Sequence, residues 1–236
     1  MEIPEHSNYD CIIVNGDSYS APNKSKVYGD YLGEAFGIPV KNFAIPGSNN
    51  DRILRSTIEY TQDIKQEYSN PLIIIGWSFI RRLEVWYYGN DKKTIKQMPD
   101  NDQSRFITLD HLLNNGLATL EQKALINDDL SLHKQLTDFY TKLYLFGNLI
   151  ESLGLDYLCF SGAKNTECPI HCFPFINSLY QVQWVTQNKN FYKLHDFCIQ
   201  KWAFKNDKDC DSVTGHLSEQ GHKKFAELLI SEVLHV

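Results

Sequence analysis

The sequence predicts an α/β protein whose parallel β-sheet is covered by helices on both faces. Short apolar runs rich in β-branched and aromatic residues alternate along the chain with segments that repeat apolar residues at helical spacing. Each apolar run is closed by Gly, Ser or Pro, as buried strands often are. A length of 236 residues with 42% hydrophobic content suits one domain of this class.

The strands and helices follow one another in the order that a parallel sheet requires. The first helical pattern ends at Gly37, which we expect to be a C-cap, and the last begins after Ser218, which we expect to be an N-cap. The predicted strands are Cys11–Val14, Val40–Phe43, Leu72–Ile75 and 156–162, and the predicted helices are Val27–Phe36, Asp51–Tyr68, Leu132–Leu153 and the C-terminal segment from Ser218 to Val233.

Two long stretches do not fit the repeat. Residues 85–130 are polar and irregular, and residues 163–190 mix aromatic residues with residues typical of loops. Long excursions in a compact domain are often lids or binding loops, although they can also serve only packing or a partner surface. We therefore predict a single domain over residues 1–236 with long insertions near 85–130 and 163–190.

The composition excludes several function classes. Lys and Arg number 23 against 29 Asp and Glu, a formal charge of -6, so nucleic acid is not expected as a partner. No run approaches the ~20 apolar residues of a membrane span. The N-terminal segment MEIPEHSNYD lacks the basic and apolar regions of a signal peptide. We therefore expect a cytoplasmic location with reduced thiols.

One cluster of cysteines and histidines resembles a metal site only weakly. Cys168, His171 and Cys172 lie close together, and His195 and Cys198 could add ligands. Their spacing matches no common zinc pattern, and a proline lies inside the cluster. We therefore expect loop cysteines and no bound metal.

Polar residues that suit nucleophilic catalysis follow the predicted strands. Ser18 ends the segment NGDS after the first strand, Gly47 lies in PGSNN after the second, and Ser78 lies in GWS after the third. Asp211 and His216 precede the last helix. The carboxyl ends of parallel strands share one edge of the sheet, where ligands usually bind. A serine nucleophile needs a base, an acid that orients the base, and donors for the oxyanion, and this edge offers each type.

Three segments resemble motifs of the SGNH, or GDSL-like, hydrolases, which are esterases and lipases on a flavodoxin-like three-layer α/β/α fold. GDSYS is similar to the first block and implies that Ser18 is the nucleophile. IPGSNND is similar to the second and implies that the N–H group of Gly47 binds the oxyanion. GHLSEQGHKKFAELL is similar to the last and implies that His216 is the base. The resemblance runs from the first strand to the last helix but does not cover 85–130 or 163–205.

The third block departs from the family pattern. The family places an asparagine, an oxyanion donor, where this chain has Ser78. A hydroxyl donates one hydrogen bond over a shorter reach than an amide. We expect Asn50, and secondarily Asn49, to supply an amide beside Ser78.

The acid also departs from the pattern. The family acid lies three residues before the histidine, where this chain has Val213. We expect Asp211 to contact the imidazole across a longer loop, with Asp209, or no acid at all, as the alternatives.

The remaining charged and titratable groups receive structural roles. We expect His222 to pack or be solvated within the last helix, and Arg81, Arg82 and Glu84 to form a solvated face rather than to bind an anion.

These features predict a serine ester hydrolase that needs no cofactor or metal. It would cleave an oxygen ester of a small molecule or glycan, with a short acyl group such as acetyl on a carbohydrate fitting best. The alternative is a catalytically decayed binding module on the same fold, glycan-binding or associated with a phage virion. A flavodoxin-type mononucleotide binder would leave the His216 segment unexplained.

Overall fold

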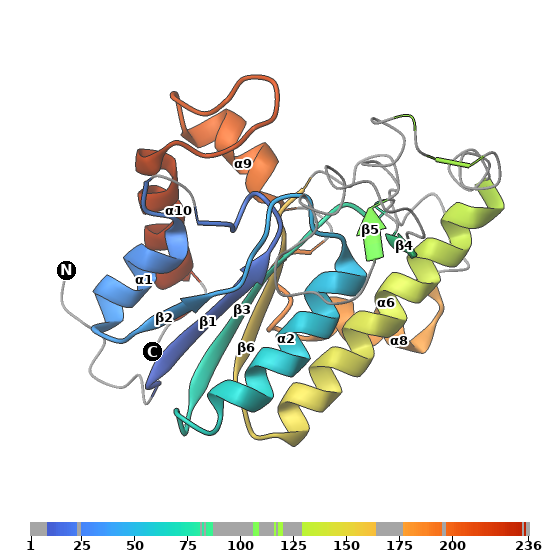
Figure 1. Ribbon diagram of the computed structural model, residues 1–236, viewed down its shortest axis with the longest axis horizontal. Helices are drawn as coiled ribbons and strands as arrows, with labels where there is room; N and C mark the ends of the chain where they lie inside the picture. Colours follow the sequence, from blue (N-terminus) through green and yellow to red (C-terminus); the bar gives the residue numbers. More distant parts are fainter. Residues whose placement is uncertain are drawn as a thin grey trace.

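The central feature of the computed structural model is a parallel sheet of four strands in the order β2–β1–β3–β6 (Figure 1). The strands are β1 (Cys11–Gly16), β2 (Val40–Asn42), β3 (Pro71–Trp77) and β6 (Tyr157–Ser161). All four predicted strands are therefore confirmed, as is the α/β class. The structure describes residues 9–22, 25–80, 82, 84–86, 106–108, 116, 118–119, 129–163, 177–194, 197–232 and 234.

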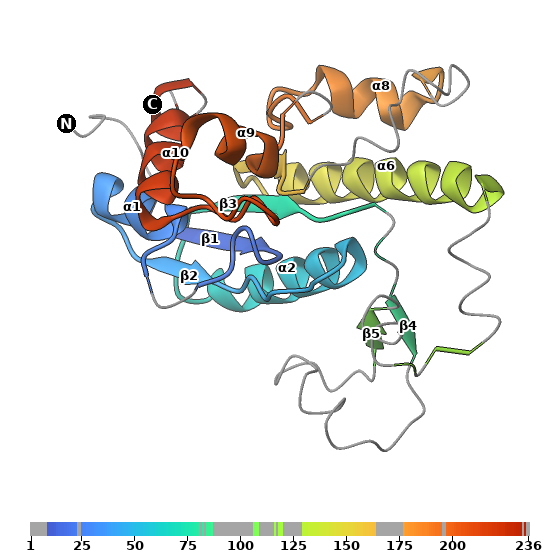
Figure 2. The ribbon, with the colours of Figure 1, turned by 90° about the horizontal axis from the view of Figure 1, so that it is seen from above.

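Helices cover both faces of this sheet and give three layers. Figure 1 shows α1 and α10 on one side of the strands and α2 and α6 on the other, and Figure 2 shows α8 beside α6. Gly37 adopts the left-handed conformation that the C-cap prediction requires, and the Ser218 hydroxyl accepts a hydrogen bond from the Gly221 N–H group. The helices are α1 (Tyr28–Phe36), α2 (Asn50–Ile64), α6 (Asp129–Ser152), α8 (Tyr180–Gln187), α9 (Ile199–Asn206) and α10 (Glu219–Glu232).

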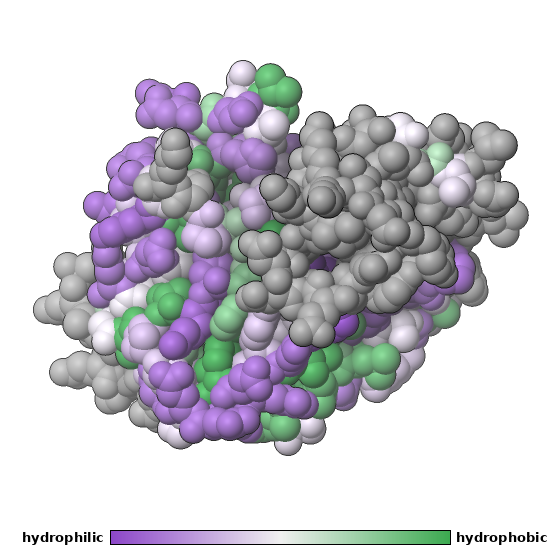
Figure 3. All heavy atoms as spheres, in the orientation of Figure 1, coloured by the Kyte–Doolittle hydropathy of each residue, from purple (hydrophilic) through white to green (hydrophobic). Residues whose placement is uncertain are grey.

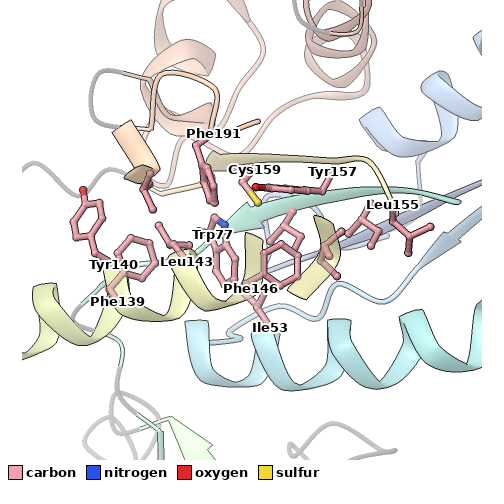
Figure 4. Close-up of a cluster of buried hydrophobic side chains, with 14 of the residues drawn as sticks. Ile53, Trp77, Phe139, Tyr140, Leu143, Phe146, Leu155, Tyr157, Cys159 and Phe191 are labelled. Carbon is pink, nitrogen blue, oxygen red and sulfur yellow. The ribbon is translucent and has the colours of Figure 1, made fainter. Parts of the chain in front are cut away.

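Most side chains of the central strands are apolar because alternate side chains enter two different cores. On β1, Ile13 packs against the α2 and α6 side, and Ile12 packs against the α1 and α10 side. Figure 4 shows the first core, where Trp77 lies edge-on to Phe139 and Phe146 of α6 at centroid distances of 6.1 and 5.9 Å. The two cores hold β1 and β3 rigidly, so the residues that follow their carboxyl ends start from fixed positions.

Two predictions about the insertions change. The stretch 163–190, where aromatic and loop residues predicted an insertion, contains the helix α8, and Val182 and Val185 of this helix are buried in the first core. The strand β4 (Glu84–Trp86), which begins one residue before the stretch 85–130, pairs antiparallel with β5 (Phe106–Thr108) inside that stretch. Helix α9 was not predicted at all. The Cys168–Cys172 cluster and His195 lie outside the described residues.

The surface over the described residues is mixed in character. Figure 3 shows hydrophilic and hydrophobic side chains interspersed over the face formed by α1, β2 and α2. Within the described ranges, no helix is both long and apolar enough to cross a membrane.

Candidate active site

The first strand ends in a turn that presents Ser18. The carbonyl of Asp17 accepts hydrogen bonds from the N–H groups of Ser20 and Ala21, and the Asp17 carboxylate accepts one from Tyr19 N–H at 3.1 Å. Gly16 precedes this turn with φ +155°, and a Cβ there would lie 2.6 Å from Ser20 Oγ. Only glycine fits this close approach. The strand therefore ends in Gly-Asp-Ser because the glycine permits the turn and Asp17 closes it, leaving Ser18 half-buried at its tip.

His216 lies against Ser18. Its Nε2 is 2.8 Å from Ser18 Oγ, although the two residues are 198 positions apart in the sequence. The imidazole comes from the loop before α10 and rests against the Tyr19 ring, with 4.7 Å between ring centroids. This geometry suits a nucleophile and the base that takes its proton.

The other imidazole nitrogen contacts a residue that the sequence analysis did not nominate. His216 Nδ1 lies 2.7 Å from the hydroxyl Oγ1 of Thr214. A threonine two residues before a histidine carries no recognised motif, so the sequence offered no signal for it. The prediction that Asp211 contacts the imidazole directly is therefore wrong.

Asp211 instead closes the turn that carries Thr214. One of its carboxylate oxygens accepts hydrogen bonds from the N–H groups of Thr214 (3.0 Å) and Val213 (2.8 Å). These two N–H groups, followed by the Thr214 hydroxyl, lower the pKa of the exposed Asp211 carboxyl below its ordinary value. The alternative acid, Asp209, is exposed, and its N–H group donates to Asp207.

Two backbone N–H groups lie in the loops that follow β1 and β2. They belong to Ser18 and Gly47, and among the residues that the structure describes neither has a hydrogen-bond partner. Gly47 is exposed with φ +82°, and nothing lies within 4 Å of the position that a Cβ would take. A hydrogen bond of 3.2 Å from Ile45 N–H to the Gly16 carbonyl holds the Gly47 loop beside the end of β1.

The Asn50 amide is not free to bind an oxyanion, contrary to prediction. Its oxygen accepts the N–H of Ser78 at 2.8 Å, and its nitrogen lies 3.3 Å and 3.4 Å from the carbonyls of Ser78 and Phe79. The secondary candidate, Asn49, caps α2 through Arg52 N–H. The Asn49 amide nitrogen has no partner, but it is buried with no access to solvent, so a bound substrate could not reach it here.

The Ser78 hydroxyl is also occupied by hydrogen bonds to other side chains. It donates to the buried Asp17 carboxylate at 2.6 Å and accepts from the Arg82 guanidinium at 2.9 Å. A hydroxyl has only one proton, so Ser78 has none left for an oxyanion. The prediction that Ser78 serves as an oxyanion donor is corrected accordingly.

Arg82 does not belong to a solvated face. Its side chain is 17% exposed and lies 3.4 Å from the Asp17 carboxylate and 3.1 Å from the Ser48 carbonyl. Burial raises the pKa of Asp17, whereas the Ser78 hydroxyl, the Tyr19 N–H group and Arg82 act in the opposite direction. Arg82, which follows β3, thus connects to Asp17 after β1 and to Ser48 after β2. Arg81 and the side chain of Glu84 lie outside the described residues.

His222 packs in the interior. It is 4% exposed, its ring centroid lies 6.2 Å from that of Tyr28, and burial lowers its pKa to about 4. Of the alternatives considered, packing is the one observed. No group of three or more His, Cys, Asp or Glu residues in the described part of the chain could hold a metal ion.

The fold and the site together define an α/β protein with a serine–histidine pair at the carboxyl edge of its sheet. No protein-family model matches the sequence, and no curated protein matches it. Among solved structures, the crystal structure of the acetyl xylan esterase AlAXEase is similar, with 12% sequence identity and a TM-score of 0.46. The similarity covers 94% of this chain and 99% of that one.

Proposed function

We propose that the protein is a serine hydrolase that cleaves oxygen esters through Ser18 and His216. The observation that carries this proposal is the 2.8 Å contact between His216 Nε2 and Ser18 Oγ at the carboxyl edge of the sheet. A serine hydroxyl is a weak nucleophile, and a base within hydrogen-bond reach activates it.

The chemistry proceeds in two halves. Ser18 Oγ attacks the acyl carbon of the ester while His216 Nε2 takes its proton, and the N–H groups of Ser18 and Gly47 bind the oxyanion. His216 then gives the proton to the departing alkoxide, which leaves an acyl group on Ser18. A water molecule attacks that acyl group with the same help from His216. The carboxylic acid leaves, and the Ser18 hydroxyl is restored.

The oxyanion site on this proposal consists of backbone donors. The side chains of Ser78 and Asn50 are engaged by Asp17 and by the backbone of Ser78 and Phe79. Losing one oxyanion donor typically costs ~10²–10³ in rate, so we expect a slower enzyme rather than an inactive one. For the substrate we propose a short acyl group, such as acetyl on a carbohydrate, because no broad apolar groove is evident in the sequence.

The hydrogen bonds that occupy the side chains of Ser78 and Asn50 also favour a second candidate function. A fold kept for binding could have lost its third donor and its direct carboxylate partner for His216. On that alternative the protein binds a glycan or forms part of a virion without hydrolysing an ester. The Ser18–His216 contact would then be a remnant.

Labelling with a fluorophosphonate probe separates the two. We expect the probe to label the wild type at Ser18, and we expect Ser18→Ala to remain unlabelled. Turnover of p-nitrophenyl esters should be greatest for the shortest acyl chains. Ser18→Ala and His216→Ala should each lower kcat by at least about 10³-fold without unfolding the protein. A folded wild type that is neither labelled nor active would refute the hydrolase proposal and favour the binding module.

A further inference from the structure

The hydroxyl of Thr214 occupies the place beside the imidazole where a catalytic carboxylate was expected. Oγ1 lies 2.7 Å from His216 Nδ1, on the opposite side of the ring from Ser18. The carboxylate of Asp211 makes no hydrogen bond to the imidazole and instead accepts the N–H group of Thr214 at 3.0 Å. Thr214 thus links His216 to the turn that Asp211 closes.

We propose that Thr214 is the positioning residue of His216, and that Asp211 acts on the imidazole only through the turn that carries Thr214. This proposal rests on the hydrolase function proposed above and deepens it.

The direction of the hydrogen bonds follows from counting protons. Nε2 must be unprotonated to accept the Ser18 proton, so the neutral imidazole must carry its proton on Nδ1. That N–H group donates to Thr214 Oγ1. The hydroxyl then accepts from the ring, and its own single proton points away from Nδ1. If the hydroxyl instead donated to Nδ1, the proton would sit on Nε2, and His216 could not act as a base.

Several hydrogen bonds hold the turn that carries Thr214. The Thr214 carbonyl accepts hydrogen bonds from the Tyr19 hydroxyl at 2.7 Å and from the Gln200 amide at 3.0 Å. Within the turn, Gly215 N–H donates to the Asp211 carbonyl at 2.7 Å, and Asp211 N–H donates to the His216 carbonyl at 3.0 Å. The backbone of Thr214 is therefore fixed whether or not its hydroxyl is present, and the hydroxyl can be removed alone.

Three substitutions test this arrangement. Thr214→Val removes the hydroxyl at nearly constant shape, and Thr214→Ser retains it. Asp211→Asn keeps an oxygen for the N–H groups of Val213 and Thr214 but replaces the carboxylate. On p-nitrophenyl acetate we expect Thr214→Val to lower kcat by about 10- to 100-fold with little change in KM, and Thr214→Ser to restore most of it. Asp211→Asn should cost about 10-fold.

The double variant carries the decisive comparison. If Asp211 acts through Thr214, Asp211→Asn should lower kcat no further once Thr214 is valine. If the two losses in kcat multiply in the double variant, Asp211 does not act through Thr214. Thr186→Val on the exposed part of α8 is the matched control and should leave kcat unchanged. Wild-type kcat in Thr214→Val would overturn the role of Thr214, and wild-type kcat in Asp211→Asn would overturn that of Asp211.

A spectroscopic readout keeps this test separate from the hydrolase proposal. ¹⁵N NMR of labelled histidine reports which ring nitrogen is protonated, and the His216 signals are those missing from His216→Gln. We expect Nδ1 to be protonated in the wild type and in Thr214→Ser, and this preference to be lost in Thr214→Val. An unchanged tautomer in Thr214→Val overturns the proposal. Because no turnover is needed, this result stands even if the wild type proves inactive towards esters and fluorophosphonates.

Discussion

The hydroxyl of Ser78 donates to the carboxylate of Asp17 over 2.6 Å, directly behind the turn that presents Ser18. Both side chains are completely buried. The hydrogen bond gives Ser78 a structural role. Ser78 supports the turn that presents Ser18, because Asp17 also accepts the Tyr19 N–H group within that turn.

Removing this hydroxyl should affect stability more than rate. Ser78→Ala leaves a buried carboxylate short of one hydrogen bond, which typically costs about 1–3 kcal/mol. We expect that loss in urea unfolding, and a fall in kcat smaller than the ~10²-fold of a lost oxyanion donor. Ser152→Ala, on the exposed end of α6, should stay within about 0.5 kcal/mol of the wild type. A severe loss of kcat at unchanged stability would return Ser78 to the oxyanion site.

Asn50→Ala should likewise lower the stability of the fold more than the reaction rate. Its carboxamide bridges the start of α2 to the backbone that follows β3, and truncation leaves the buried N–H group of Ser78 without its acceptor. We expect a loss of about 1–3 kcal/mol in the free energy of unfolding. Asn206→Ala on exposed α9 is the control, expected within about 0.5 kcal/mol. A stable Asn50→Ala with kcat reduced ~10²-fold would mean that this amide does serve the oxyanion.

The sequence predicted the framework well because strands buried on both faces leave a plain signal. The runs at Cys11 and Leu72 are continuously apolar, and each ends at the residues that carry the site. Ser18 and His216 were paired through the resemblance of their segments to hydrolase motifs, because His216 lies between α9 and α10 rather than after a strand. Helix α8 was missed because few of its eight residues are buried, so its apolar pattern is short.

Hydrogen-bond partners within the site were predicted poorly. Three residues lie near the predicted site but have other roles than those predicted: Asn50, Ser78 and Arg82. What decides their roles is the direction of a side chain over a few ångströms, and spacing in the sequence carries no such information. Thr214 was missed for the same reason. Its hydroxyl matters because a turn closed by Asp211 aims it at the imidazole.

His222 should make stability depend on pH. Burial lowers the folded-state pKa to about 4 from the ordinary 6.5, so the unfolded chain binds the proton more readily. This contribution is fully present above about pH 6.5 and is lost as the pH falls towards 4, by up to about 3 kcal/mol. His222→Leu should flatten that part of the stability curve, measured by urea unfolding at pH 4.5, 5.5 and 7. An unchanged slope in His222→Leu would assign the effect to other groups.

The last prediction concerns the backbone donor at Gly47. Gly47 has φ +82°, and a Cβ there would meet nothing within 4 Å, so Gly47→Ala strains the backbone without a steric clash. The strain typically costs about 1–2 kcal/mol and tends to rotate the peptide whose N–H group we assign to the oxyanion. We expect a stability loss of that size and a fall in kcat of about 10-fold or more, with little change in KM.

Gly37 provides the matched control for that prediction. It has φ +69° and equally open surroundings, but it caps α1 at Phe36, away from the carboxyl edge of the sheet. Gly37→Ala should therefore cost about the same 1–2 kcal/mol while leaving kcat unchanged. The difference in kcat between the two variants isolates the position of the Gly47 N–H group from general strain. If both variants lose stability equally and both keep the wild-type kcat, Gly47 is not an oxyanion donor, and the Ser18 N–H group acts without it.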